Sequence, residues 1–326
     1  MKNIVLTLTV FVSLLYAEEN WVRRAAFDIG SGSTKMVVAD VDVNSSAIKI
    51  IHTQDEKVDY QQDLETSESF SQSVKDAGIL ALAKLKWIAV QKGATQFRAV
   101  ATASFRNAKN GSEFAQFISK VLGINVTIIS QKEEATLGFY GALAGENLQP
   151  QNAVVWDIGA GSMQIATIVD KQYVIYEGKL ASVTLANYIV KEIQKKEGNS
   201  PNPISQEEKN KAYDYARSVA KNIPQAIKDK IKNKESKILG IGGVHYYSLR
   251  PRLKMGDEYG SDALAEALRY NGIGKTDEQI GSKYASTETS NLILVEAFMH
   301  ELGMKTVKPK KVNMANGVLI HSVMWE

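Results

Sequence analysis

Short apolar runs bounded by turn residues recur through the first half of this 326-residue chain, with helical patterns between the later ones. The apolar runs predict five strands, at residues 24–27, 36–39, 47–52, 97–101 and 126–129. Apolar residues at helical spacing predict helices over residues 69–91 and 111–122. The first half therefore predicts a strand-rich hairpin followed by α/β units.

The same order returns in the second half of the chain. Apolar runs at residues 153–156 and 165–169 predict a second hairpin, and residues 237–240 predict a later strand. Helical patterns cover residues 183–196, 206–231 and 291–302, the last of them strongly amphipathic, and residues 318–323 close the chain. A repeat this long exceeds the roughly 20–50 residues of a solenoid unit, so it indicates a duplicated domain.

A similar glycine-rich turn joins the two strands of each predicted hairpin. The first reads Phe27-Asp28-Ile29-Gly30-Ser31-Gly32-Ser33-Thr34-Lys35, and the second reads Trp156-Asp157-Ile158-Gly159-Ala160-Gly161-Ser162-Met163-Gln164. Glycines allow a sharp turn whose backbone N–H groups approach a ligand, and hydroxyl groups add donors. One such turn is more typical of a solvated hairpin tip, whereas two favour a cleft between related domains that grips phosphate. The residues expected to bind phosphate are Asp28, Gly30, Ser31, Gly32, Ser33, Thr34, Lys35, Gly159, Ala160, Gly161, Ser162 and Gln164.

The composition excludes several classes of site. A net charge of +3, from basic residues scattered along the chain, gives no reason to expect a nucleic-acid partner. The chain contains no cysteine, which excludes disulfides, thiol catalysis and thiolate metal sites. Its four histidines show no pair at metal-ligand spacing, so each is expected to be a surface or packing residue.

The N-terminus has a short basic start, an apolar stretch over residues 4–16 and a small residue, Ala17, before two acidic residues. This pattern predicts a secretory signal peptide over residues 1–17, with an uncleaved anchor as the alternative. No other run approaches membrane length, so we expect no membrane association after signal removal. An exported α/β chain without cysteine favours the bacterial periplasm.

Four segments occur in an order and spacing that resemble one family. They are the two glycine-rich turns, residues 98–111 (Arg-Ala-Val-Ala-Thr-Ala-Ser-Phe-Arg-Asn-Ala-Lys-Asn-Gly) and residues 128–137 (Ile-Ile-Ser-Gln-Lys-Glu-Glu-Ala-Thr-Leu). From about Ala25 to Ile168 the chain resembles the exopolyphosphatase / guanosine pentaphosphate phosphohydrolase (Ppx/GppA) family of the actin-like ATPase superfamily. The resemblance implies an α/β fold of two actin-like (ribonuclease H-like) domains, each a mixed sheet with flanking helices, with a cleft between them. It places domain I at residues 21–135 and domain II at residues 136–326, and leaves open whether the C-terminal helix returns to domain I.

The resemblance also implies an activity, the removal of the terminal phosphate from inorganic polyphosphate or a nucleoside polyphosphate by Glu-assisted attack of water, with Mg²⁺ as cofactor. Glu134 takes the position of the family's catalytic Glu, the base for water; the alternative is a surface carboxylate beside Glu133 at a helix start. Arg106 matches a phosphate-contacting catalytic Arg, with a solvated Arg as the alternative. Asp157 matches the catalytic carboxylate that holds a metal ion or water at the second turn, and Asp28 is its counterpart in the first.

Three positions depart from the family pattern. Gln164 stands where most members have Glu, Met163 where they have Thr, and Thr136 where they have Arg. A glutamine amide cannot act as an anionic metal ligand or as a base, although it can orient water or a phosphate oxygen. These departures keep a second hypothesis open, a catalytically weakened protein of the same fold that binds polyphosphate or a nucleotide.

A third glycine turn, Gly242-Gly243, follows the strand predicted at residues 237–240. It resembles the superfamily turn that contacts adenosine, so it is a candidate contact for a nucleotide or substrate; a plain strand-to-helix turn is the alternative. An ATP-dependent sugar kinase or a filament protein would share the hairpins, but neither explains Arg106 and residues 130–137. Whether the chain forms a homodimer stays open.

Overall fold

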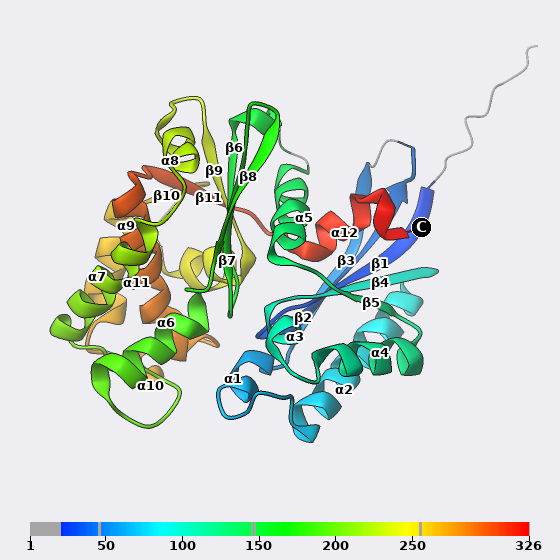
Figure 1. The fold of residues 1–326 in the computed structure, drawn as a ribbon, viewed down its shortest axis with the longest axis horizontal. Coiled ribbons are helices and arrows are strands. Elements are labelled where there is room, and N and C mark those ends of the chain that lie inside the picture. The colour runs from blue at the N-terminus through cyan, green and yellow to red at the C-terminus, as the bar shows by residue number, and fades with distance from the viewer. Residues whose placement is uncertain (1–20, 45–46, 145, 147, 254–255, 326) are drawn as a thin grey trace, which may run out of the picture.

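The computed structural model describes residues 21–325, apart from positions 45–46, 145, 147 and 254–255. Two mixed sheets with flanking helices form two lobes (Figure 1). The predicted α/β fold class is therefore confirmed, whereas the predicted signal peptide, residues 1–17, lies outside the described residues. Within the described part of the chain, every helix is too short or too polar to span a bilayer.

The first sheet has the strand order β3-β2-β1-β4-β5. Three strands form an antiparallel meander, and two more extend it in parallel: β1 (Trp21–Ile29), β2 (Ser33–Asp42), β3 (Ile48–Lys57), β4 (Gln96–Ala101) and β5 (Asn125–Ile128). Helices α2 (Gln72–Gln91) and α4 (Gly111–Leu122) pack on this sheet through an apolar cluster that includes Phe27, Leu85 and Ile118. Two short helices of the first lobe, α1 (Tyr60–Leu64) and α3 (Ala103–Asn107), lie on the side of it that faces the second lobe (Figure 1).

The second sheet, ordered β10-β11-β9-β6-β7-β8, repeats this topology. Its strands are β6 (Ala153–Ile158), β7 (Met163–Val169), β8 (Gln172–Gly178), β9 (Lys237–Ile241) and β11 (Thr306–Pro309), with β10 (Tyr259–Gly260) added at the edge. Its helices are α6 (Ser182–Tyr188), α7 (Gln206–Ala220), α8 (Gln225–Lys232), α9 (Ser261–Ala267), α10 (Asp277–Ile280) and α11 (Ala285–Leu302). The strands of the meander, β6 to β8, correspond to β1 to β3, so the duplication expected from the two glycine turns is present in the fold.

Three predicted helices differ from the observed ones. The helix predicted over residues 206–231 is divided into α7 and α8, because Pro224 lacks the N–H that a continuous helix would need. The helix predicted over residues 183–196 continues from α6 into a π-helical segment, Ile189–Gln194. Helix α11 begins at Ala285 rather than at residue 291, and it is buried on most faces rather than amphipathic, because α6, α7 and α9 surround it.

Helices α5 (Gln131–Leu143) and α12 (Met314–Ile320) lie between the two sheets (Figure 1). The C-terminal helix α12 packs against α5 and against β1, β2 and β4 of the first sheet. An apolar cluster joins residues of both sheets to these helices, including Val37 and Val100 from the first sheet and Val155 and Leu239 from the second. The two lobes are therefore joined by an apolar cluster to which both sheets contribute.

The crossing of α5 and α12 requires a glycine at position 317. A Cβ atom there would clash with the backbone carbonyl of Leu137, and backbone atoms cannot move aside as a flexible side chain can. We expect Gly317→Ala to lower the free energy of unfolding by about 2 kcal/mol, within the usual range for overpacking a tight contact. Urea denaturation followed by circular dichroism measures the change. Gly256→Ala is the matched control, because no atom lies within 4 Å of the added methyl group; an equal loss in both variants would contradict the close crossing.

Candidate active site

The two glycine turns have the same backbone geometry. In the first, the Gly30 N–H donates to the Ser33 carbonyl at 3.0 Å, and in the second the Gly159 N–H donates to the Ser162 carbonyl at 3.0 Å. A Cβ atom on either glycine would lie 3.2–3.3 Å from the same carbonyl oxygen. Both turns therefore depend on glycine to close tightly at the end of the strand that carries the Asp.

The turns face each other across the space between the lobes. A Cβ atom on Gly32 would lie 3.4 Å from the Cβ of Ala160, and one on Gly161 would lie 3.0 Å from the hydroxyl oxygen of Ser31. Both turns line a cleft of about 540 Å³, together with Asp28, Asp157, Glu134 and the turn at Gly242 and Gly243. The structure therefore brings together three segments that are far apart in the sequence.

Asp28, Lys35 and Asp157 form the charged centre of this cleft. Asp28 and Lys35 are cross-strand partners on β1 and β2, and the Lys35 ammonium lies 3.3 Å from an Asp28 carboxylate oxygen. Burial raises the pKa of Asp157 to about 7, since the charge of Lys35 lowers it only in part and that of Asp28 raises it further. Burial by itself would lower the pKa of Lys35, but the charges of Asp28 and Asp157 outweigh it and the pKa is raised.

The third glycine turn supports the second one. Gly242 has φ +86°, and a Cβ atom there would clash with a carboxylate oxygen of Asp157 and lie 2.5 Å from the Ile158 carbonyl. Both the left-handed backbone and the close approach require glycine. Gly243, by contrast, has no atom within 4 Å of a Cβ position, although it too lines the cleft.

Glu133 and Glu134 have different roles in α5. The Ser130 side chain and the Glu133 carboxylate cap the helix reciprocally, so Glu133 stays exposed at the helix start. Glu134 is 7% exposed and lines the cleft, where Arg106 donates to its carboxylate at 2.9 Å. Burial raises the pKa of Glu134 to about 8, since the Arg106 charge opposes burial only in part and Asp157 and Asp28 raise the pKa further. Glu134 is therefore not a surface carboxylate, which was the alternative that the sequence left open.

Arg106 lies behind Glu134. One of its terminal nitrogens, Nη1, donates to the Glu134 carboxylate and to the Ile129 carbonyl, the latter at 2.7 Å. Its other terminal nitrogen, Nη2, is buried and has no partner among the described residues. Arg106 is not among the residues that line the cleft, so the structure shows it positioning the Glu134 carboxylate and does not place it at the phosphate contact expected from the resemblance.

Two residues expected to bind phosphate do not line the cleft. Thr34 is fully buried between Ser33 and Lys35, because successive side chains of a strand point to opposite faces. Gln164 is 1% exposed; its amide nitrogen donates to the Ser162 hydroxyl at 3.1 Å, while its amide oxygen has no partner among the described residues. Gln164 therefore supports the second turn through its hydrogen bond to Ser162 and does not face the cleft.

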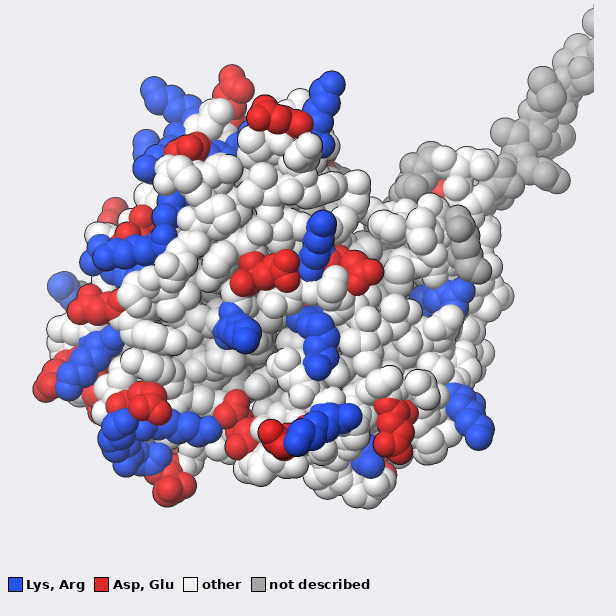
Figure 2. All heavy atoms as spheres, in the orientation of Figure 1, with Lys and Arg blue, Asp and Glu red and all other residues white. Residues whose placement is uncertain are grey.

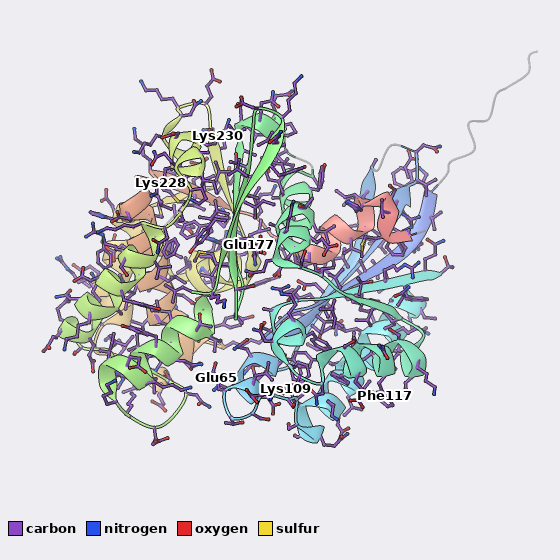
Figure 3. All side chains as sticks on the ribbon, in the orientation of Figure 1. Glu65, Lys109, Phe117, Glu177, Lys228 and Lys230 are labelled. Atoms are coloured by element: carbon purple, nitrogen blue, oxygen red, sulfur yellow. The ribbon has the colours of Figure 1, made fainter. Side chains whose placement is uncertain are left out.

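Several cleft residues were not identified from the sequence. They come from β3, from the start of α1, from the segment after β9, and from the segment before and within α11: Asp55, Lys57, Gln61, Tyr247, Lys283, Tyr284 and Asn291. Lys283 also forms an ion pair with Asp55 of the other lobe at 3.5 Å. A second ion pair between the lobes joins Lys191 to Glu65, at the end of α1 (Figure 3), at 2.8 Å. No local motif marks these residues, because only the folding of distant segments brings them to the cleft.

The donor set does not fit a divalent ion held by the protein alone. Among the described residues, no group of three or more His, Cys, Asp or Glu side chains is placed to hold a metal ion. Asp157 would have to bind the ion near the Lys35 ammonium, and the position opposite Asp157 on β7 is the neutral Gln164. Because Mg²⁺ is usually held by one or two carboxylates together with substrate phosphates and waters, Asp28 and Asp157 would hold it only together with a bound phosphate.

A duplicated pair of glycine turns around one cleft defines an α/β protein of the actin-like class. The chain belongs to the Ppx/GppA phosphatase family, because the model of that family matches residues 36–297. This confirms the family prediction. The match begins directly after the first glycine turn and extends well beyond Ile168, where the resemblance in the sequence ends.

Solved structures share this fold at low sequence identity. An exopolyphosphatase-like protein has a TM-score of 0.76 and 17% identity, over 92% of this chain and 97% of its own. The Aquifex aeolicus PPX-GPPA enzyme has a TM-score of 0.70 and 16% identity, over 92% and 99% of the two chains. An exopolyphosphatase from Cytophaga hutchinsonii has a TM-score of 0.73 and 15% identity, over 93% and 97%. These likenesses establish the fold.

The two buried carboxyl groups predict a pH dependence of stability. The pKa values of these groups in the folded protein are about 8 for Glu134 and about 7 for Asp157, above those of an unfolded chain. Between about pH 4 and these values, the folded protein therefore binds more protons than the unfolded chain. The stability that the two protonated carboxyl groups contribute is fully present below about pH 4. It is lost as the pH rises through 7 and 8, at up to about 1.4 kcal/mol per pH unit for each group. We expect Glu134→Gln to reduce this slope in urea denaturation at pH 5 to 8.

Glu235→Gln, which removes an exposed carboxylate, is the matched control for that experiment. A slope that is the same in the wild type and in Glu134→Gln would show that the Glu134 carboxyl group keeps an ordinary affinity for protons in the folded protein.

Proposed function

We propose that the protein hydrolyses the terminal phosphoanhydride bond of inorganic polyphosphate or of a nucleoside polyphosphate in this cleft. The observation that carries the proposal is the position of Glu134. Its buried carboxylate lines the same cleft as both glycine turns, where an attacking water would lie beside a bound phosphate.

The turns supply the groups that would hold the phosphate. Backbone N–H groups of glycine turns bind phosphate oxygens, and the hydroxyl groups of Ser31 and Ser162 line the cleft as additional donors. The Lys35 ammonium would offset the negative charge of the phosphate. Arg106, which does not itself line the cleft, would hold the Glu134 carboxylate toward the water.

The proton-accepting group is suited to its proposed role. A general base works best when its pKa lies near the operating pH, and burial raises that of Glu134 to about 8. Deprotonated Glu134 would take a proton from water as the water attacks the terminal phosphorus and the phosphoanhydride oxygen leaves. Hydrolysis should therefore rise with pH between about 6 and 8.

A second candidate function, binding without efficient hydrolysis, is supported by Gln164. This residue is neutral and is turned toward Ser162 rather than into the cleft, so the second turn lacks the carboxylate that most family members have there. Binding of polyphosphate without phosphate release would favour this function, and hydrolysis restored by Gln164→Glu would identify the missing carboxylate.

We also propose that the protein acts in the bacterial periplasm. The proposal rests on the signal-peptide pattern of residues 1–17. A periplasmic location favours inorganic polyphosphate as the substrate over guanosine pentaphosphate, which is a cytoplasmic compound. Fractionation of cells that produce the full chain would test the location.

We expect Glu134→Gln and Asp157→Asn each to lower kcat at least tenfold, which corresponds to about 1.4 kcal/mol of transition-state stabilisation. Each substitution keeps the shape of the side chain and removes the negative charge that would activate water at Glu134 or hold a metal ion or water at Asp157. Colorimetric phosphate release from polyphosphate and from guanosine pentaphosphate, with and without Mg²⁺, measures the effect.

Glu133→Gln is the matched control, because Glu133 caps the same helix from its exposed side. Wild-type rates in both cleft variants would exclude the proposed roles, and no phosphate release by the wild type from either substrate would exclude the hydrolase.

A further inference from the structure

Helices α2 and α4 carry large apolar side chains on their outer sides. Leu80 and Trp87 lie two helical turns apart, so they share one side of α2, and they are 71% and 64% exposed. Phe117 and Val121 lie one turn apart on α4, and both are exposed. Phe117 projects from the outer edge of the first lobe (Figure 3). Side chains of this size are normally found in the core, so their exposure on both helices requires an explanation.

The exposed residues of the two helices belong to one surface. The Lys86 ammonium of α2 donates to the Leu122 carbonyl at the end of α4, so the helices lie side by side there. Val90 follows Lys86 by one turn and Val121 precedes Leu122, so apolar residues of both helices meet at this contact. We call this surface the α2–α4 patch; it consists of Leu80, Trp87, Val90, Phe117 and Val121. Apolar residues gathered on one face indicate an interaction site, whereas single exposed ones do not.

The α2–α4 patch lies apart from the cleft. Helices α2 and α4 cover one face of the first sheet, and α5 and α12 cover the opposite face, which is joined to the second lobe (Figure 1). Among the described residues, those that line the cleft include none from α2 or α4. A partner bound to the patch would therefore leave the cleft open.

The charge around the patch is one-sided. From Ala77 to Lys132 the chain has eight basic residues and one acidic residue, Glu113. Lys92, directly after α2, and Lys120, in the last turn of α4, are exposed at the end where the two helices meet. Apolar and aromatic residues bordered by lysines are typical of protein surfaces that bind anionic lipid. An isologous dimer through this patch would instead bring two basic faces together, and they would repel each other.

The chain enters the first lobe at this same end of the helices. Arg23, near the start of β1, donates to the Lys92 carbonyl at 3.0 Å. Four residues separate Trp21 from the apolar stretch of residues 4–16, and four extended residues span at most about 14 Å. An apolar stretch inserted in a bilayer during export would therefore bring the α2–α4 patch to the membrane surface.

We propose that the α2–α4 patch binds the surface of a membrane that contains anionic phospholipids, with Trp87 and Phe117 inserted at the level of the headgroups and Lys92 and Lys120 near their phosphates. Tryptophan favours this interface because its ring is largely apolar and its N–H is polar. From the length of the apolar runs we expected no membrane association after signal removal, but the patch is assembled from two helices and contains no long run. This role is independent of hydrolysis in the cleft.

Sedimentation with lipid vesicles tests the proposal on residues 18–326, which contain every element of both lobes. The wild type is expected to bind vesicles with about 30% phosphatidylglycerol at least tenfold more tightly than pure phosphatidylcholine vesicles, and to lose this preference in about 0.5 M NaCl. The double variant Trp87→Ser with Phe117→Ser is expected to bind at least tenfold more weakly. Lys92→Gln with Lys120→Gln is expected to reduce the preference for the anionic vesicles.

Matched controls come from the second lobe. Tyr270→Ser removes an aromatic side chain that is 63% exposed, and Lys234→Gln removes an exposed charge, so both are expected to bind vesicles as the wild type does. Circular dichroism establishes that each variant is folded.

Three results would overturn the proposal. The first is a wild type that stays in solution with the anionic vesicles, and the second is equal binding by the wild type and the Trp87→Ser, Phe117→Ser variant. The third comes from analytical ultracentrifugation: a wild-type dimer that this variant dissociates would assign the patch to a second copy of the chain.

Discussion

The arrangement of this protein depends on one electrostatic constraint, the burial of two carboxylates from different domains around a single ammonium. Asp28 and Asp157 are the next-to-last residues of β1 and β6, and Lys35 forms an ion pair with Asp28 while the charge of Asp157 also acts on it. Two unpaired carboxylates would repel each other in a site of low dielectric constant. The shared cation therefore stabilises the close approach of the turns and leaves the cleft ready for an anionic ligand.

Close backbone approach is the second requirement of the site. Gly242 lies against Asp157 and Ile158, and Gly317 lies against α5, so glycine is needed both at the cleft and at the helix crossing beneath it. The surface elsewhere carries both signs of charge interspersed on the face shown in Figure 2, in agreement with the small net charge. The charged and polar groups that are candidates for phosphate binding and catalysis thus lie together in the cleft rather than over the surface.

Much of the fold was predictable because its signals are local. The eight predicted strands, the two glycine turns and helix α4 follow from apolar runs and turn residues. Strands β8, β10 and β11 and the break at Pro224 between α7 and α8 were not predicted. The sequence analysis left open whether Glu134 is a surface carboxylate beside Glu133, and the structure decided it, because Glu133 caps the helix with Ser130 while Glu134 is buried. Burial of α11 on most faces was not predictable, because it depends on which helices pack around it.

The sequence by itself determined the class of fold, the duplication and the residues of the two turns, because strand periodicity and glycine conformation act within a few residues. Only the tertiary structure decided which of those residues share the cleft. It directed Thr34 and Gln164 away from the cleft, brought Gly242 against Asp157, and placed the charge of Lys35 within reach of both lobes. Electrostatic and steric interactions act over a few ångströms between segments far apart in the chain, so they arise only when the two domains pack together.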